Sequence, residues 1–124
     1  MVENKGYKKL KVWQEAHEFV LMIYEFTKRF PKEEVFSLTN QLRRAAVSVA
    51  ANIVEGQVKN SRKSFIQALN IANGSLVEAE YYLELARELK FLDTKGFDKL
   101  DRQRVIVGNL LNGLIKSLKD RCEA

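Results

Sequence analysis

The sequence has little of several residue types on which enzymes and secreted domains depend. Its 124 residues include one cysteine, one histidine and one proline. The lone thiol, Cys122, cannot form an internal disulfide, so we expect a reducing compartment. Only Pro31 could break a helix sharply, and there is no Gly/Ser-rich linker, so residues 1–124 are expected to form a single domain.

Long apolar runs are also missing. No segment approaches the roughly 20 apolar residues that a transmembrane helix needs. The N-terminal MVENKGYKKLKVW carries charges but lacks the apolar core of a signal peptide. We therefore expect a cytoplasmic protein without a membrane partner.

The residues that usually carry catalysis are sparse. His17 is the single histidine, and no glutamate stands three residues before it, which excludes the paired Glu-x-x-His motifs of di-metal helical bundles. Glu15 and Glu18 are spaced as in some nucleotide pyrophosphohydrolases, but a matching acidic pair is missing. There is no Gly-rich phosphate loop and no nucleophile–base triad. The sequence thus predicts a protein that is not an enzyme and that holds neither a cofactor nor a metal ion.

Helical periodicity dominates what is present. Four long segments, at about 10–29, 38–55, 63–89 and 98–121, have apolar residues at three- and four-residue steps, and none alternates as a strand would. Short connections favour antiparallel neighbours, so the sequence predicts an all-α, antiparallel up-down-up-down four-helix bundle. Gly56 is expected to cap the second helix, Ser61 or Ser64 to cap the third, and Gly96 with Asp98 to form the turn before the fourth.

Each segment has a predicted core line. Small residues on the second and third lines should let those helices approach closely, and Gly108 and Gly113 should do the same for the fourth. The core lines are Trp13, Ala16, Val20, Ile23, Tyr24 and Thr27, widened by Val12, Phe19, Phe26 and Phe30; Leu38, Leu42, Ala45, Val49 and Ile53; Phe65, Leu69, Ala72, Leu76, Ala79 and Leu83; and Leu100, Val107, Leu111, Leu114 and Leu118.

A line of polar residues crosses the otherwise small and apolar second segment. Its members, at three- and four-residue steps on one side of the helix, are Gln41, Arg44, Ser48, Asn52 and Glu55. They could form a solvated face, a structural network or a ligand site. We favour the network, inside the bundle or between subunits, in which Arg44 and Asn52 meet carboxylates such as Glu78 or Glu80, because buried charges between helices need partners.

Apolar residues exceed what one thin bundle can bury. They continue on a second side of the second helix and on the third, at Val47, Ala50, Val54, Tyr81 and Tyr82. Because contiguous exposed apolar surface usually marks an interface, we predict a homo-oligomer.

The charge balance is mildly basic, with a formal net charge of +5 and a pI near 9.4. Two basic clusters stand out, one near the N-terminus and one between the second and third helices. They could simply keep the surface hydrated, or they could contact phosphate backbones of RNA or DNA. The clusters consist of Lys8, Lys9 and Lys11, and of Lys59, Arg62 and Lys63.

Three segments together resemble the intervening-sequence protein family, whose members are bacterial and are named for reading frames inserted in 23S ribosomal RNA genes. The segments are LKVWQEAHEF, FPKEEVFSLTNQLRRAAVSVAANIVEG and FIQALNIANGSLVEAEYYLELA. The resemblance implies a four-helix bundle that assembles as a ring, a pentamer in related proteins. It also extends to accessory proteins of diversity-generating retroelements, which are basic pentamers linked to nucleic acid and a reverse transcriptase. One departure is Ala50, where many members carry proline.

Two functions follow as expectations. The favoured one is a non-enzymatic homo-oligomeric scaffold that binds RNA or other nucleic acid through repeated basic patches. The alternative is a protein-interaction module, such as an accessory partner of a polymerase-like enzyme, that does not bind nucleic acid directly.

Overall fold

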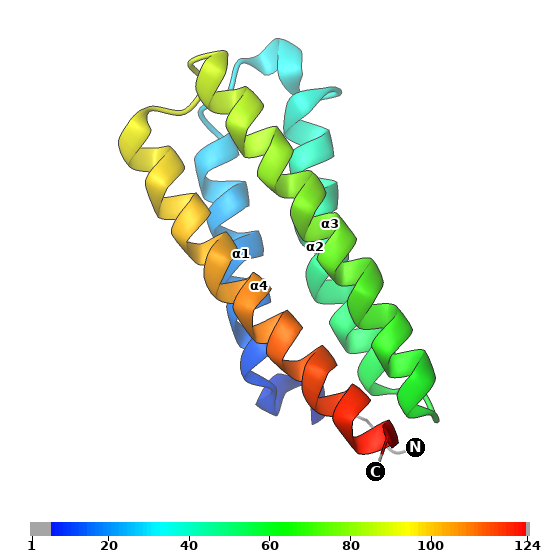
Figure 1. Ribbon diagram of the computed structural model, residues 1–124. Coiled ribbons are helices and arrows are strands. Elements are labelled where there is room, and N and C mark those ends of the chain that lie inside the picture. Colours follow the sequence, from blue (N-terminus) through cyan, green and yellow to red (C-terminus); the bar gives the residue numbers. More distant parts are fainter. Residues whose placement is uncertain (1–5, 124) are drawn as a thin grey trace.

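The computed structural model describes residues 6–123, which form four long helices and no strand (Figure 1). The fold is therefore all-α, as predicted. Two short 3-10 helices precede α1 and α2. In chain order the elements are η1 (Gly6–Lys9), α1 (Lys11–Thr27), η2 (Lys32–Glu34), α2 (Leu38–Gln57), α3 (Arg62–Glu88) and α4 (Thr94–Glu123).

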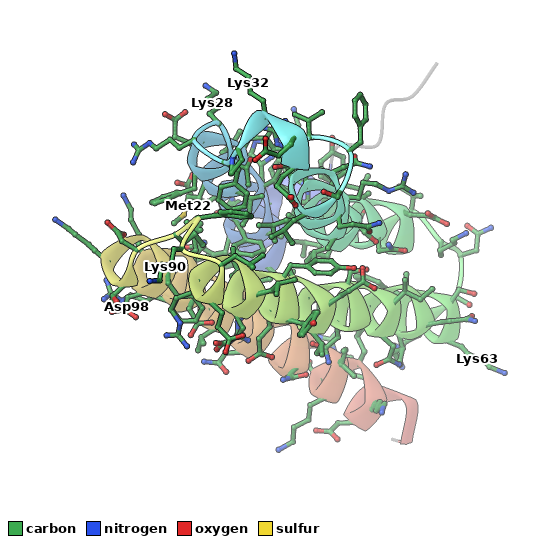
Figure 2. The ribbon with its side chains drawn as sticks, turned by 90° about the horizontal axis from the view of Figure 1, so that it is seen from above. Met22, Lys28, Lys32, Lys63, Lys90 and Asp98 are labelled. Atoms are coloured by element: carbon green, nitrogen blue, oxygen red, sulfur yellow. The ribbon has the colours of Figure 1, made fainter. Side chains whose placement is uncertain are left out.

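The helices pack side by side as a bundle. Neighbouring contacts join α1 to α2, α2 to α3, α3 to α4 and α4 back to α1. In Figure 1 the start of α1, the α2–α3 connection and the end of α4 lie at one end of the bundle, and the other two connections lie at the opposite end. Figure 2 shows the same separation along α3, with Lys63 at its start and Lys90 beyond its far end.

The two ends of α3 are defined by local chemistry. Ser61 caps its start, because its hydroxyl accepts the backbone N–H of Ser64 at 3.0 Å. At its end Lys90 adopts a left-handed conformation (φ 68°), which turns the chain toward α4. The predicted serine cap is confirmed at Ser61.

The fourth helix begins earlier than predicted. It starts at Thr94, and the carboxylate of Asp93 accepts the backbone N–H of Gly96 at 2.7 Å. Asp93 thus satisfies a free N–H of the first helical turn, and Gly96 lies inside that turn. The expected entry turn at Gly96 and Asp98 is wrong.

The core confirms the predicted lines of α2 and most of those of α3 and α4. All five predicted positions of α2 are buried, whereas Phe65 of α3 and Leu114 of α4 are half-buried. The predicted line of α1 is displaced: Val12 and Phe19 are buried, whereas Tyr24 is exposed. The apolar arc of α1 covers nearly half its circumference, so spacing alone could not identify its centre.

Close contact between α2 and α3 depends on Gly56. A Cβ atom there would lie 2.8 Å from Cβ of Ala68 and 2.9 Å from Cδ1 of Phe65. Gly56 is a helical residue within α2, without a positive φ, so the expected cap role is wrong. Its role is to let the two helices approach.

The glycines of α4 behave differently from the prediction. A Cβ atom at Gly108 would make only ordinary contact, 3.4 Å from Leu76, and one at Gly113 would meet nothing within 4 Å. Neither glycine is needed for the approach of a neighbouring helix.

The α1–α2 connection holds one large side chain away from the core. Phe36 is 93% exposed, yet the turn around it is well bonded. The Glu34 carboxylate accepts the hydroxyl of Ser37 at 2.8 Å, and the Ser37 N–H bonds the carbonyl of Glu34 at 3.0 Å. Phe36 is therefore presented on an ordered turn at the end of the bundle opposite the α2–α3 connection (Figure 1).

Replacing Gly56 by alanine should destabilise the fold by about 1–2 kcal/mol. Overpacking at Ala68 costs about 1–3 kcal/mol, and the better helix propensity of alanine recovers up to about 1. Gly113→Ala is the matched control, expected to be stabilising by about 0.5–1 kcal/mol because its site is open. Urea unfolding of both variants at one protein concentration measures the change in the free energy of unfolding. Equal stabilisation by both substitutions would contradict the role of Gly56.

Candidate functional site

The polar line of α2 meets α3 at two residues. The hydroxyls of Ser48 and Ser75 lie 2.8 Å apart, which is possible because the flanking side chains are small. The amide of Asn52 donates to the backbone carbonyl of Ser48 at 2.8 Å and to its hydroxyl at 3.1 Å. These three half-buried residues form one hydrogen-bonded seam between α2 and α3.

The other members of the line point to water. The side chains of Gln41 and Arg44 are exposed and form no hydrogen bond or ion pair with the described residues, while Glu55 pairs with Lys59 at 3.4 Å. Asn52 is already bonded to Ser48. Within one subunit the predicted contacts of Arg44 and Asn52 with Glu78 or Glu80 therefore do not occur.

The two carboxylates expected to face α2 have other neighbours. Glu80 pairs with Arg104 of α4 at 3.2 Å, and Arg104 also bonds Asp101 at 2.7 Å. Glu78 is exposed and lies next to Tyr82. Burial and, to a lesser degree, the Glu78 carboxylate raise the pKa of Tyr82.

Of the two adjacent arginines, Arg43 and Arg44, it is Arg43 that is held in place by contacts within the subunit. It was not among the predicted site residues. It donates from Nε to the Thr27 hydroxyl at 2.8 Å, and its guanidinium lies 4.6 Å from the centre of the Tyr24 ring. Consecutive helix positions differ by about 100°, so Arg43 points toward α1 while Arg44 does not. Both arginines line an open hollow of about 460 Å³ that also includes Tyr24 and Val47.

The two predicted basic clusters share one end of the bundle. Lys8 and Lys9 lie in η1, while Lys59 lies in the α2–α3 connection and Lys63 in the first turn of α3, at the same end of the bundle (Figure 1). Two of the predicted cations are partly neutralised: Lys59 by Glu55, and Lys11 by Glu15 at 3.4 Å. The side chains of Lys8, Lys9, Arg62 and Lys63 are exposed.

Three cations of α4 join this end and were not predicted. The exposed side chains of Lys116, Lys119 and Arg121 lie in the last turns of the helix, where the chain returns to the α2–α3 end. They were not predicted because they lie far along the sequence from both basic clusters. The side chain of Cys122, nearby, lies outside the described part of the structure.

Aromatic contacts hold the N-terminal cluster in place. Tyr7 packs edge-on against Trp13, with ring centres 5.1 Å apart, and Trp13 stacks on His17 at 4.9 Å. The Gln14 amide donates to the carbonyl of Lys8 at 2.9 Å. These contacts fix η1 against α1, so the lysines of η1 extend from an ordered element.

Among the residues described, no group of three or more acidic, histidine or cysteine side chains could hold a metal ion. Glu15 accepts a hydrogen bond from Gln103 at 3.0 Å, which lowers the pKa of Glu15, with Lys11 nearby adding to the effect. Glu15 is thus a bonded carboxylate between α1 and α4.

Across residues 6–123, no helix combines the length and apolar character needed to cross a bilayer.

Comparisons with known proteins identify the family. A family model described as 23S rRNA-intervening sequence protein matches residues 8–113. A solved structure, a protein of unknown function from the S23 ribosomal protein family of Bacteroides thetaiotaomicron, is 30% identical with a TM-score of 0.79, covering 85% of this chain and 95% of that one. No curated protein matches. The chain belongs to the 23S rRNA-intervening sequence protein family.

Proposed function

We propose that this chain forms a non-enzymatic homo-oligomeric scaffold in the cytoplasm that binds RNA or other nucleic acid. The observation that carries the proposal is the gathering of cations from η1, the α2–α3 connection and the end of α4 at one end of the bundle (Figure 1). Lysine and arginine side chains in such a cluster suit the phosphate backbone, without reading base sequence.

Assembly would multiply this surface. A single cluster of a few cations makes a weak, salt-sensitive contact. In an oligomer several copies of the cluster bind the same chain of phosphates, and the linked contacts combine into a much higher affinity. Oligomerisation and nucleic-acid binding therefore support each other in this proposal.

Two separate apolar stripes favour assembly into a ring. The outer stripe of α2 consists of Val47, Ala51, Val54 and Val58, at steps of four, three and four residues. The outer stripe of α3 consists of Ile71, Gly74, Val77 and Tyr81, of which Val77 and Tyr81 are 60% and 61% exposed. Of the predicted interface residues, Val47 and Tyr81 are exposed, while Ala50 and Tyr82 pack against the core.

The position of the stripes suggests how subunits join. They lie on different helices, with the Ser48–Ser75 seam between them. Contact between the α2 stripe of one subunit and the α3 stripe of the next would be heterologous, and heterologous contacts form a ring when the rotation from subunit to subunit closes. This agrees with the pentamer that the family resemblance implies. The positions of the helix ends in Figure 1 likewise support an antiparallel up-down-up-down topology.

A protein-interaction module is the second candidate. The exposed Phe36, held on an ordered turn, is the observation that favours it, because rigid aromatic side chains are frequent anchors in protein interfaces. In this case the scaffold would bind a protein such as a polymerase-like enzyme, and its basic end would serve only solubility.

Replacing Lys59, Arg62 and Lys63 together by glutamine should weaken binding to duplex RNA by roughly tenfold and make binding less sensitive to salt, because phosphate contacts are lost. Fluorescence anisotropy at about 50 and 200 mM salt measures both effects. The control variant K28Q/K32Q/K90Q removes the same charge from the opposite end of the bundle (Figure 2). Equal losses in the two variants would contradict a role for the basic end.

Val47→Glu should reduce the oligomer to smaller species without unfolding the subunit, because Val47 is 40% exposed and a charge there opposes an apolar contact. Leu21→Glu is the control, an exposed apolar residue of α1 outside both stripes. Light scattering after gel filtration measures the mass of each variant, and circular dichroism measures its helix content. Together they show whether Val47→Glu, unlike Leu21→Glu, loses assembly while it stays folded. A wild-type protein that is monomeric at micromolar concentration would end the proposal of an oligomer.

Arg44→Ala tests whether the exposed Arg44 of the polar line contributes to contacts between subunits. Since Arg44 has no partner among the described residues of its own subunit, its loss should lower the melting temperature only through assembly. The decrease, a few degrees, should grow smaller on dilution toward the monomer. An unchanged melting temperature and oligomer would show that Arg44 is merely solvated.

A further inference from the structure

Several exposed cations on the other elements of the bundle have an acidic partner three or four residues away in the sequence. Lys28 pairs with Glu25 at 3.2 Å, and Arg87 pairs with Glu84 at 2.7 Å. On α4 the paired cation is Arg104, which is largely covered and faces Glu80 of α3. Acidic partners on α4 are thus placed on the side of the helix that faces the bundle.

The outward side of α4 is different. Lys95, Lys99, Arg102 and Lys116 fall on one line of the helix, since 95, 99, 102, 106, 109, 113 and 116 are three or four residues apart. None of the four forms an ion pair with the residues described. Lys99 has only a distant contact, 6.0 Å from the centre of the Phe26 ring. This face therefore keeps a net positive charge, because its cations outnumber the nearby carboxylates of Asp98 and Asp120.

The cations border two open hollows on α4. The upper hollow, about 570 Å³, includes Lys95, Lys99 and Arg102 together with one acid, Asp98. The lower hollow, about 470 Å³, includes Lys116 and Arg121 together with Asp120. In each hollow the cations outnumber the single carboxylate, so each retains a net positive charge.

The separation of the hollows indicates the kind of ligand. Their centres, near Asp98 and Ser117, are about 28 Å apart along one helix at 1.5 Å per residue. A small anion could fill one hollow but could not reach both. A nucleic-acid duplex carries a negative charge every 1.7 Å or so of its axis, hence about 16 charges over this span. The side chains between the hollows, such as Ile106 and Asn109, are uncharged.

We propose that the outer face of α4 is a track for the backbone of duplex nucleic acid, which it contacts at two points. The proposal rests on the proposed nucleic-acid function and extends it from the basic end to the opposite end of the bundle. The lower hollow lies at the basic end, so the duplex runs from there along α4 to Lys95, Lys99 and Arg102. The outer stripes of α2 and α3 lie on other helices, so this face stays open when those stripes are covered.

The test compares K95Q/K99Q/R102Q with the control K28Q/K32Q/K90Q, which removes the same charge from the same end of the bundle but not from α4. Figure 2 shows Lys28 and Lys32 extending outward, away from α4. Gel filtration and circular dichroism first establish that both variants keep the wild-type assembly and helix content. Anisotropy is then measured with RNA and DNA duplexes of about 20 base pairs and with a hairpin stem of about six, which is too short for both hollows.

The α4 variant should bind the long duplex roughly tenfold more weakly than wild type, with a shallower salt dependence, and the control less than about twofold more weakly. Binding of the short hairpin should be the same in the α4 variant and in wild type. RNA and DNA results side by side identify which duplex is preferred.

Two outcomes would overturn the proposal, and they differ from each other. If wild type binds and K59Q/R62Q/K63Q weakens binding, but the α4 variant equals its control, the track is absent while the basic end keeps its role. If wild type binds none of the probes at about 50 mM salt, the proposed nucleic-acid function fails and the track fails with it.

Discussion

The close approach of α2 and α3 is the constraint on which the rest of the structure depends. Gly56 has no room for a Cβ atom beside Ala68, and about two helical turns away the two hydroxyls of Ser48 and Ser75 meet at 2.8 Å. Larger side chains at any of these positions would separate the helices and break the seam. The same approach sets the short α2–α3 connection, and with it the position of Lys59 and Lys63 at the end of the bundle.

The parts of the fold that sequence predicts well are those where side-chain type and spacing agree. On α2, small and apolar residues recur at three- and four-residue steps and every predicted core position is buried. On α1, apolar residues occupy nearly half the circumference, so periodicity cannot distinguish Phe19, which is buried, from Tyr24, which is exposed. The roles of the glycines were predicted poorly. Gly56 and Gly96 are typical of helix ends, but they lie inside helices where a tight contact or an aspartate cap accommodates them, and Gly108 and Gly113 are not needed for a close approach.

The polar line of α2 also shows what residue spacing cannot predict. Its residues were identified from spacing, but their partners were not, because serine and asparagine can bond to their own helix as readily as to a neighbour. Asn52 does so with the carbonyl of Ser48. The arginine that matters within the subunit, Arg43, is distinguished from Arg44 only by the direction of Thr27 and Tyr24, which no spacing rule in α2 contains. The cations of α4 were overlooked because they are spread along the helix, whereas sequence reading favours clusters.

The exposed Phe36 has a consequence for any cyclic assembly whose helices run along the symmetry axis. Rotation would bring every copy of the α1–α2 turn to one face of the ring and every copy of the α2–α3 connection to the other. Such a ring would be two-sided: one side a circle of aromatic rings on stiff turns, the other a circle of ammonium and guanidinium groups. A particle of this kind could hold two chemically unlike molecules at once, one on each side, at a distance set by the length of a helix.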